Sequence, residues 1–168
     1  MDRPKQPDPF ARLQIMALTV IQPWAHAIVH LGKQIENRDW PAQYRGWLAI
    51  HAGRETPKAE YEGFFEFCGE RDLFVQMPRR ADLVTSAIIG VARLTHCVRR
   101  HDSPWFVGDY GWVLENPIAI PAPVKCSGRR NLWGLAPELR QGVLYQIGAE
   151  MLAIERNAQM EQARRSLV

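Results

Sequence analysis

The stretch Leu18 to Trp40, LTVIQPWAHAIVHLGKQIENRDW, brings an apolar run, a helix start, a glycine turn and a dense polar group close together in the chain. Leu18 to Ile21 predicts a short buried strand, and Pro23 ends it because proline favours the first turn of a helix. The apolar side chains of the expected helix recur at spacings of four and three, so they share one face: Trp24, Ile28 and Leu31. Gly32 then suits a left-handed cap, after which the chain delivers Lys33.

A polar strand is predicted to follow this helix. From Gln34 the pattern changes to a period of two, which places alternate side chains on one side of a strand: Gln34, Glu36, Arg38 and Trp40. Ile35 and Asn37 would point to the other side. This pattern indicates either a polar site or an ordinary solvent-facing strand that carries an incidental Glu–Arg pair.

GxKxxExR and four further motifs, which occur in order along the chain, carry a resemblance to a known family. QPWA is followed by GxKxxExR, then by an RGxLxIHA-type strand, and later by GxVxL-type and LWxL segments. Together they resemble the activating-signal-cointegrator homology (ASCH) domain over about Ala17 to Leu135. The residues that fill GxKxxExR are Gly32, Lys33, Glu36 and Arg38. The resemblance implies a small β-barrel similar to the PUA domains of RNA-modifying enzymes, with its ligand cleft beside this motif.

We therefore predict an α+β fold, a PUA-like small β-barrel with flanking helices and a C-terminal helix. Five runs are expected to form one closed or nearly closed, mainly antiparallel barrel: Leu18–Ile21, Ile35–Arg38, Gly46–His51, Ala87–Val98 and Tyr110–Leu114. The expected boundaries are a flexible N-terminal arm over residues 1–13, an ASCH/PUA-like barrel domain over 14–136 and a docked helix over 137–168.

Two regions of the chain are predicted from prolines and from helical spacing. Asn116-Pro117 should break the fifth strand, leaving short edge-like pieces at Ile118–Ile120 and Val124–Cys126 between prolines. The last helix should carry one apolar stripe and fray after about Asn157. A weak homodimer through this stripe is the alternative to docking on the barrel.

Composition limits the classes of function. A chain of 168 residues with 46% hydrophobic residues fits one domain with a single core. The formal charge of +3 is too small to diagnose a nucleic-acid binder by itself. With no signal-peptide or membrane-length apolar run, we expect a cytoplasmic protein that has no membrane partner.

We expect neither a metal nor a cofactor. The three cysteines are far apart and contain no CxxC, so neither a disulfide framework nor a zinc site is indicated. His26 and His30 have the i, i+4 spacing of a metal-binding pair, but the HExxH glutamate and an obvious third ligand are missing from the sequence.

The candidate site is built around a cation, an acid and a guanidinium, which suit an anion or a base edge. The expected ligand-binding residues are Trp24, Lys33, Glu36, Arg38, His51, Tyr110, Trp112, Arg129 and Arg130. His51 also allows a blander interpretation, a buried histidine satisfied by backbone. This inventory predicts binding of a nucleotide or of single-stranded RNA or DNA, with the aromatic residues stacking on bases.

The enzymatic alternative uses Lys33 and Glu36 as catalytic residues. Some small ASCH members hydrolyse the amide of acylated cytidine with a threonine three residues after the lysine, and others are described as ribonucleases. This sequence has Glu36 in place of that threonine, which changes both the charge and the nucleophile. The sequence therefore leaves open a binding module and a hydrolase acting on RNA or on an acylated nucleoside.

Overall fold

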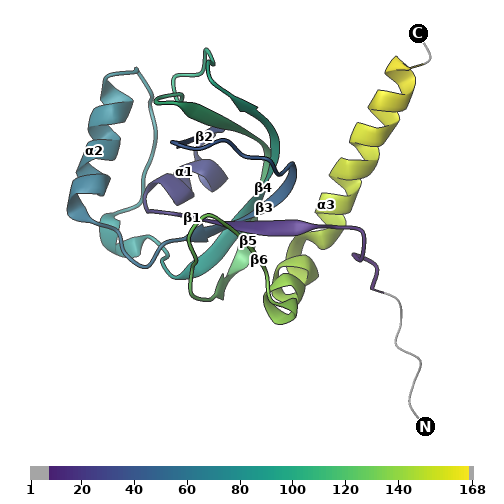
Figure 1. The fold of residues 1–168 in the computed structure, drawn as a ribbon. Coiled ribbons are helices and arrows are strands. Elements are labelled where there is room, and N and C mark those ends of the chain that lie inside the picture. The colour runs from purple at the N-terminus through teal and green to yellow at the C-terminus, as the bar shows by residue number, and fades with distance from the viewer. Residues whose placement is uncertain (1–7, 167–168) are drawn as a thin grey trace.

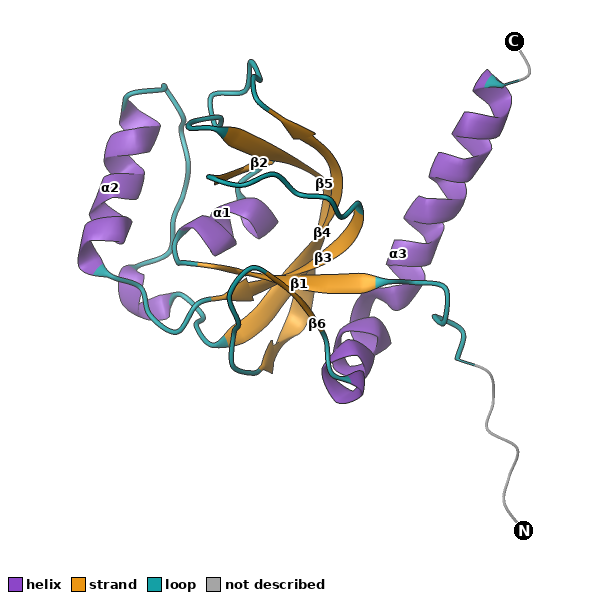
Figure 2. Ribbon diagram, in the orientation of Figure 1, coloured by secondary structure: helices purple, strands orange, loops and turns teal. Residues whose placement is uncertain are grey.

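The structure, a computed structural model, describes residues 8–166 (Figures 1 and 2). Its strands are β1 (Ile15–Val20), β2 (Ile35–Arg38), β3 (Gly46–Ala52), β4 (Ala87–Val98), β5 (Tyr110–Lys125) and β6 (Leu132–Gly134). Its helices are α1 (Trp24–His30), α2 (Lys58–Gly69), the short 3-10 helix η1 (Arg80–Asp82) and α3 (Pro137–Arg165).

The six strands form one curled sheet in the order β2-β5-β4-β3-β1-β6. Only β1 and β3 pair in parallel among these strands, and the other neighbours are antiparallel. The edge strands β2 and β6 do not pair with each other, so the sheet is a half-barrel (Figure 2). The predicted α+β class, with a barrel-like sheet, flanking helices and a C-terminal helix, is confirmed.

The alternation along β3 divides the core between the two faces of the sheet, as its sequence predicted. Trp47 and Ala49 lie in the core that packs under α3, together with Val143 and Met151 of that helix. The intervening residues of β3 belong to the core around α1, inside the curl: Leu48, Ile50 and Ala52. The layers therefore run α3, sheet, α1 and then α2, as Figure 1 shows.

A third apolar cluster joins α2 to α1 and to the β2 edge. Phe64 and Cys68 of α2 are buried there with Ile35 of β2 and Trp105 of the β4–β5 loop. The helical spacing of the α2 aromatics suits core packing of this kind, although Phe65 stays 43% exposed. This cluster fixes α2 as one wall beside the polar strand.

Strand β5 contradicts the predicted break at Asn116-Pro117, because it continues to Lys125. Asn116 takes a positive φ of 51°, and the register between β4 and β5 shifts along the pair, so the irregular residues are absorbed within the strand. None of Pro117, Pro121 and Pro123 is a register partner of β4, so their missing N–H groups cost no ladder bond. Similarly, β1 starts at Ile15, before the predicted Leu18.

Helix α3 continues to Arg165, past the fraying point expected near Asn157, since its last turns consist mainly of good helix formers. Its first half packs on the sheet through buried residues such as Ile147, and Trp47 Nε1 donates to Glu155 Oε1 at 3.0 Å. Residues 1–7 of the predicted arm lie outside the described residues, whereas Leu13 is buried. No helix in the described part of the chain is long and apolar enough to cross a membrane.

Candidate functional site

The end of α1 and the whole of β2 bring the motif side chains together. Gly32 adopts a φ of +71°, as predicted for a cap, and Lys33 N donates to Ala27 O at 3.1 Å. The chain then turns into β2, where Glu36 is the register partner of Trp112 in β5. The backbone therefore places Lys33 directly beneath the polar side of the edge strand.

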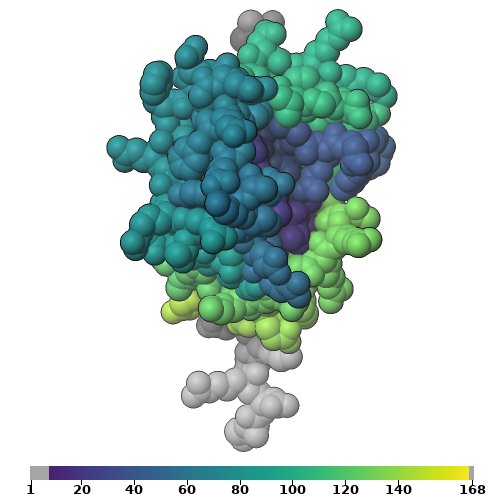
Figure 3. All heavy atoms as spheres, turned by 90° about the vertical axis from the view of Figure 1, so that its left-hand side faces the viewer, coloured from purple at the N-terminus to yellow at the C-terminus, as the bar shows by residue number. Residues whose placement is uncertain are grey.

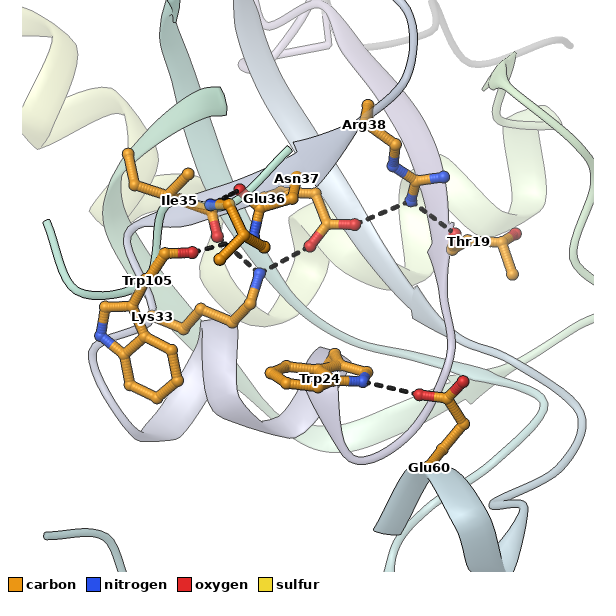
Figure 4. A network of polar contacts seen from close by, with 10 residues as sticks. Thr19, Trp24, Lys33, Ile35, Glu36, Asn37, Arg38, Glu60 and Trp105 are labelled. Atoms are coloured by element: carbon orange, nitrogen blue, oxygen red, sulfur yellow. Dashed lines mark hydrogen bonds and ion pairs between the residues drawn. The ribbon is translucent and has the colours of Figure 1, made fainter. Parts of the chain in front are cut away.

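Lys33, Glu36 and Arg38 form a continuous chain of ion pairs, shown in Figure 4. Lys33 Nζ lies 2.7 Å from Glu36 Oε2, and Arg38 Nη2 lies 3.0 Å from Glu36 Oε1. Lys33 also donates to the carbonyl of Ile35. One carboxylate therefore serves two cations, and the group keeps one net positive charge.

Burial makes this group unusual for an ion-pair chain. Lys33 is only 3% exposed and Glu36 only 6%. Burial alone raises the pKa of Glu36, but the charges of Lys33 and Arg38 and their hydrogen bonds lower it by more, so this pKa lies below its ordinary value of 4.5. Glu36 is therefore an anion at neutral pH that is held by two cations.

Arg38 bridges the open side of the half-barrel. Its Nη2 donates to the carbonyl of Thr19 in β1 at 3.2 Å, and its guanidinium lies 5.9 Å from the ring centre of Trp112. Its Nε is buried without a hydrogen-bond partner among the described residues. A buried donor without a partner costs about 1–3 kcal/mol, a cost that the ion pair with Glu36 and the hydrogen bond to Thr19 must offset.

Trp24 supplies the flat wall of the site. Its Nε1 donates to Glu60 Oε2 of α2 at 3.0 Å, and its edges meet the rings of Phe64 and Phe67. In Figure 4 the indole is seen edge-on with one ring face turned toward the ion-pair chain, and Lys33 Nζ lies 5.8 Å from its centre. The contacts with α2 therefore hold this ring in place.

These groups line a cavity of about 710 Å³ that opens on the surface seen in Figure 3. Its lining comes from β1, α1, β2, the loop between β3 and α2, the last turn of α2 and the β4–β5 loop: Thr19, Val20, Ile21, Trp24, Lys33, Glu36, Asn37, Arg38, Gly53, Arg54, Glu55, Pro57, Phe67 and Val107. The purple atoms of the N-terminal strand region are visible at the base of the hollow. The cavity therefore combines apolar lining residues with the charged side chains of Lys33, Glu36 and Arg38.

Four of the predicted site residues line this cavity, and five do not. Those that line it are Trp24, Lys33, Glu36 and Arg38. Trp112 is fully buried in the core around α1, so it offers no free ring for stacking, contrary to the expected role. Tyr110 lies outside the lining, where its hydroxyl accepts a 2.6 Å hydrogen bond from Arg99 Nη2.

His51 lies on the sheet face away from the cavity, 1% exposed, with Nε2 3.0 Å from the carbonyl of Cys126. This is the backbone-satisfied interpretation of the residue, although Nδ1 has no partner among the described residues. Arg129 and Arg130 are exposed on the segment between β5 and β6 and do not line the cavity themselves. Arg129 lies 5.9 Å from the ring centre of Trp133.

Several lining residues were not predicted. The backbone of Thr19 reaches the cavity because the curl of the sheet brings β1 opposite β2, and Val107 arrives on a loop that carries no motif. Phe67 lies on the aromatic face of α2, which also packs against Trp24 and Trp105. Helical spacing alone could not show that this face also walls a cavity.

His26 and His30 stack at 4.4 Å between ring centres, as their spacing allows. Burial, followed by the charge of His30, lowers the pKa of His26 from 6.5 to about 4. Within residues 8–166, no three His, Cys, Asp or Glu side chains come together as a group that could hold a metal ion.

Comparisons with known proteins address the family. No family model matches the sequence. The chain is 25% identical over 142 residues to human activating signal cointegrator 1, and 23% identical over 137 residues to the mouse protein. Each match covers 74% of this chain but 23% of the relative, so the chain spans about a quarter of the length of these relatives.

Among solved structures, the ASCH protein of Zymomonas mobilis aligns with a TM-score of 0.48 at 15% identity, covering 77% of this chain and 92% of that one. A mutant form of the same protein aligns with a TM-score of 0.44 at 14% identity, covering 76% and 94%. The sequence matches to activating signal cointegrator 1 support the resemblance of this chain to an ASCH domain.

Proposed function

We propose that this domain binds one nucleotide unit, either free or within single-stranded RNA or DNA, in the cavity beside Lys33, Glu36 and Arg38. The observation that carries the proposal is the buried ion-pair chain with two cations and one carboxylate, set opposite the Trp24 indole that lines the same cavity. A nucleotide combines the two chemistries that this arrangement accepts, because it has an anionic group and a flat aromatic ring.

The polar half of the site favours a ligand with acceptor oxygens. An ammonium has three donors, and two of those of Lys33 are used by Glu36 and by the Ile35 carbonyl. The Arg38 side chain is 23% exposed beside it, so part of the guanidinium remains accessible. A phosphate or a base carbonyl would accept from this accessible part, and a guanidinium is well suited to phosphate.

The apolar half favours a flat group. Stacking of a base on an aromatic side chain is worth roughly 1–3 kcal/mol and tolerates any base. Trp24 is fixed by its hydrogen bond to Glu60, so little ordering would be needed on binding. The cavity volume of about 710 Å³ lies within the roughly 300–1,000 Å³ common for small-ligand sites. The resemblance to the ASCH domain points to the same ligand class.

A hydrolase that acts on RNA or on an acylated nucleoside remains the alternative, with Lys33 and Glu36 as its catalytic residues. Both oxygens of Glu36 already accept from a cation, so this carboxylate must release one of them before it can relay a proton. This double engagement favours binding over turnover.

The test measures the affinity for nucleoside monophosphates and for short RNA and DNA strands by calorimetry or by Trp fluorescence. Arg38→Ala and Trp24→Ala should each weaken binding by roughly 1–3 kcal/mol, through a lost charge-assisted contact and through lost stacking respectively. Tyr145→Ala is the matched control, because this aromatic side chain is 89% exposed on α3 and remote from the cavity. Unchanged binding by folded Arg38→Ala and Trp24→Ala would refute the assignment.

Turnover is tested separately with acylated nucleosides and labelled single-stranded RNA. We expect no product from the wild-type protein. Product that appears with the wild type and disappears with both Lys33→Ala and Glu36→Gln would replace the binding function with the hydrolase.

A further inference from the structure

The segment 126–131, which joins β5 to β6, borders the cavity although none of its residues lines it. The carbonyl of Thr19 faces the cavity and binds Arg38, whereas its side chain lies on the opposite face of the sheet and accepts a hydrogen bond on Oγ1 from Trp133 Nε1 at 3.3 Å, just after this segment. Gly128 lies against the same hydroxyl, because a Cβ built on it would come within 2.6 Å of Thr19 Oγ1. In Figure 3 the light-green atoms of this part of the chain form one rim of the hollow.

Backbone and side-chain contacts hold the segment 126–131 in place. Cys126 N donates to Ser86 O at 3.1 Å, and the carbonyl of Cys126 lies 3.0 Å from Nε2 of the buried His51. A Cβ on Gly128 would also lie 2.6 Å from Cε1 of His51, so only glycine allows this close approach. The two residues that follow, Arg129 and Arg130, are therefore presented from a fixed backbone.

The charge of the segment 126–131 is uncompensated. Arg129 and Arg130 are exposed, the sequence CSGRRN contains no acid, and neither arginine forms an ion pair within residues 8–166. Arg129 lies near the ring of Trp133, where a guanidinium can be shared between an aromatic face and a phosphate. This rim therefore offers two free positive charges beside a site that itself carries one.

The other rims offer less to an anion. On the α2 side, the lining residue Glu55 is paired with Arg54, Glu60 accepts a hydrogen bond from Trp24, and further acids follow along the helix. On the loop after β4, Arg99 is occupied by Tyr110 through a 2.6 Å hydrogen bond and a 4.8 Å cation–π contact. A chain of phosphates leaving the cavity would be repelled by the first rim and attracted most by the segment 126–131.

We infer that the ligand is a single-stranded nucleic acid and not a free nucleotide, and that the strand leaves the cavity across the segment 126–131, where Arg129 and Arg130 bind its backbone phosphates. The inference rests on the proposed function, since the cavity holds the first nucleotide of the strand. His51 is a positioning residue in this arrangement, because it holds the carbonyl at the start of the segment.

The test compares a nucleoside monophosphate with a single strand of about ten nucleotides, as RNA and as DNA, at several salt concentrations. In the double variant Arg129→Ala/Arg130→Ala, the dependence of log affinity on log salt should become shallower by about 0.7 for each lost phosphate contact, so by about 1.4 for the strand. Binding of the monophosphate should stay unchanged. Arg38→Ala should weaken both ligands.

The matched control is Arg164→Ala/Arg165→Ala, which removes the same two charges from the far end of α3 (Figure 1) and should leave strand binding unchanged. An equal loss in this control would show an effect of net charge alone and would overturn the inference. Wild-type salt dependence in the Arg129→Ala/Arg130→Ala protein, with monophosphate binding intact, would overturn the inference but leave the proposed function standing. Binding of neither ligand by the wild type would refute the proposed function itself.

Discussion

Replacing Glu36 with glutamine tests whether the buried ion-pair chain holds the site together. The substitution keeps the size of the side chain but leaves one acceptor oxygen for two cations that now lie 2.7 and 3.0 Å from separate oxygens. Either Lys33 or Arg38 must lose its partner, and the amide N–H group would face a cation. Breaking a buried pair costs roughly 3–5 kcal/mol. Since the amide oxygen keeps one hydrogen bond, we expect Glu36→Gln to lower the free energy of unfolding by about 3 kcal/mol.

The assay is urea unfolding followed by Trp fluorescence, and the matched control is Glu55→Gln. Glu55 also lines the cavity and pairs with Arg54 at 3.1 Å, but its side chain is 68% exposed. An exposed pair contributes about 0–1 kcal/mol, so the control should stay close to the wild type. A Glu36→Gln protein as stable as Glu55→Gln would refute the role given to the ion-pair chain.

The pH dependence gives a second measurement on the same variant. The pKa of Glu36 is lowered in the folded protein, so its stabilising contribution is fully present above the ordinary value of 4.5 and is lost as the pH falls through the folded value. The difference in stability between wild type and Glu36→Gln should therefore shrink on acidification. At neutral pH the Glu36→Gln variant should bind anions more tightly than the wild type, because the loss of the carboxylate makes the net charge of the site more positive by one.

Three further outcomes are expected. Gly128→Ala should destabilise the protein by about 1–3 kcal/mol and weaken strand binding, because its Cβ would overlap His51. The control Gly134→Ala, with no atom within 4 Å of its Cβ, should do neither. Equal unfolding midpoints for the two variants would contradict this expectation. Trp112→Ala should lower stability by roughly 3–5 kcal/mol as a core residue, and a fully stable variant with lost binding would instead restore its predicted stacking role. Because the pKa of His26 falls from 6.5 to about 4 on folding, the free energy of unfolding should decline as the pH is lowered from 6.5 to 4. His26→Gln should flatten this decline in pH-dependent unfolding.

The sequence predicted most of what local patterns can specify. The period-two alternation in the sequence of β3 matches the two faces on which its side chains lie, because a strand must alternate whatever surrounds it. The spacing of Gly32, Lys33, Glu36 and Arg38 confined the charged group to one turn and one strand. Its ion pairs could be predicted from that stretch alone, since they join residues at most three positions apart.

Only the tertiary structure decided which distant residues join this group. The curl of the sheet sets the Thr19 carbonyl against Arg38, and the packing of α2 on α1 turns Trp24 into a fixed wall, yet no sequence spacing encodes either contact. The same curl buries Trp112 beneath the site and turns His51 to the other face of the sheet, although both looked like ligand-binding residues in their strands. A strand pattern gives the side on which a residue lies, whereas its exposure depends on the layer that packs there, and that layer comes from elsewhere in the chain.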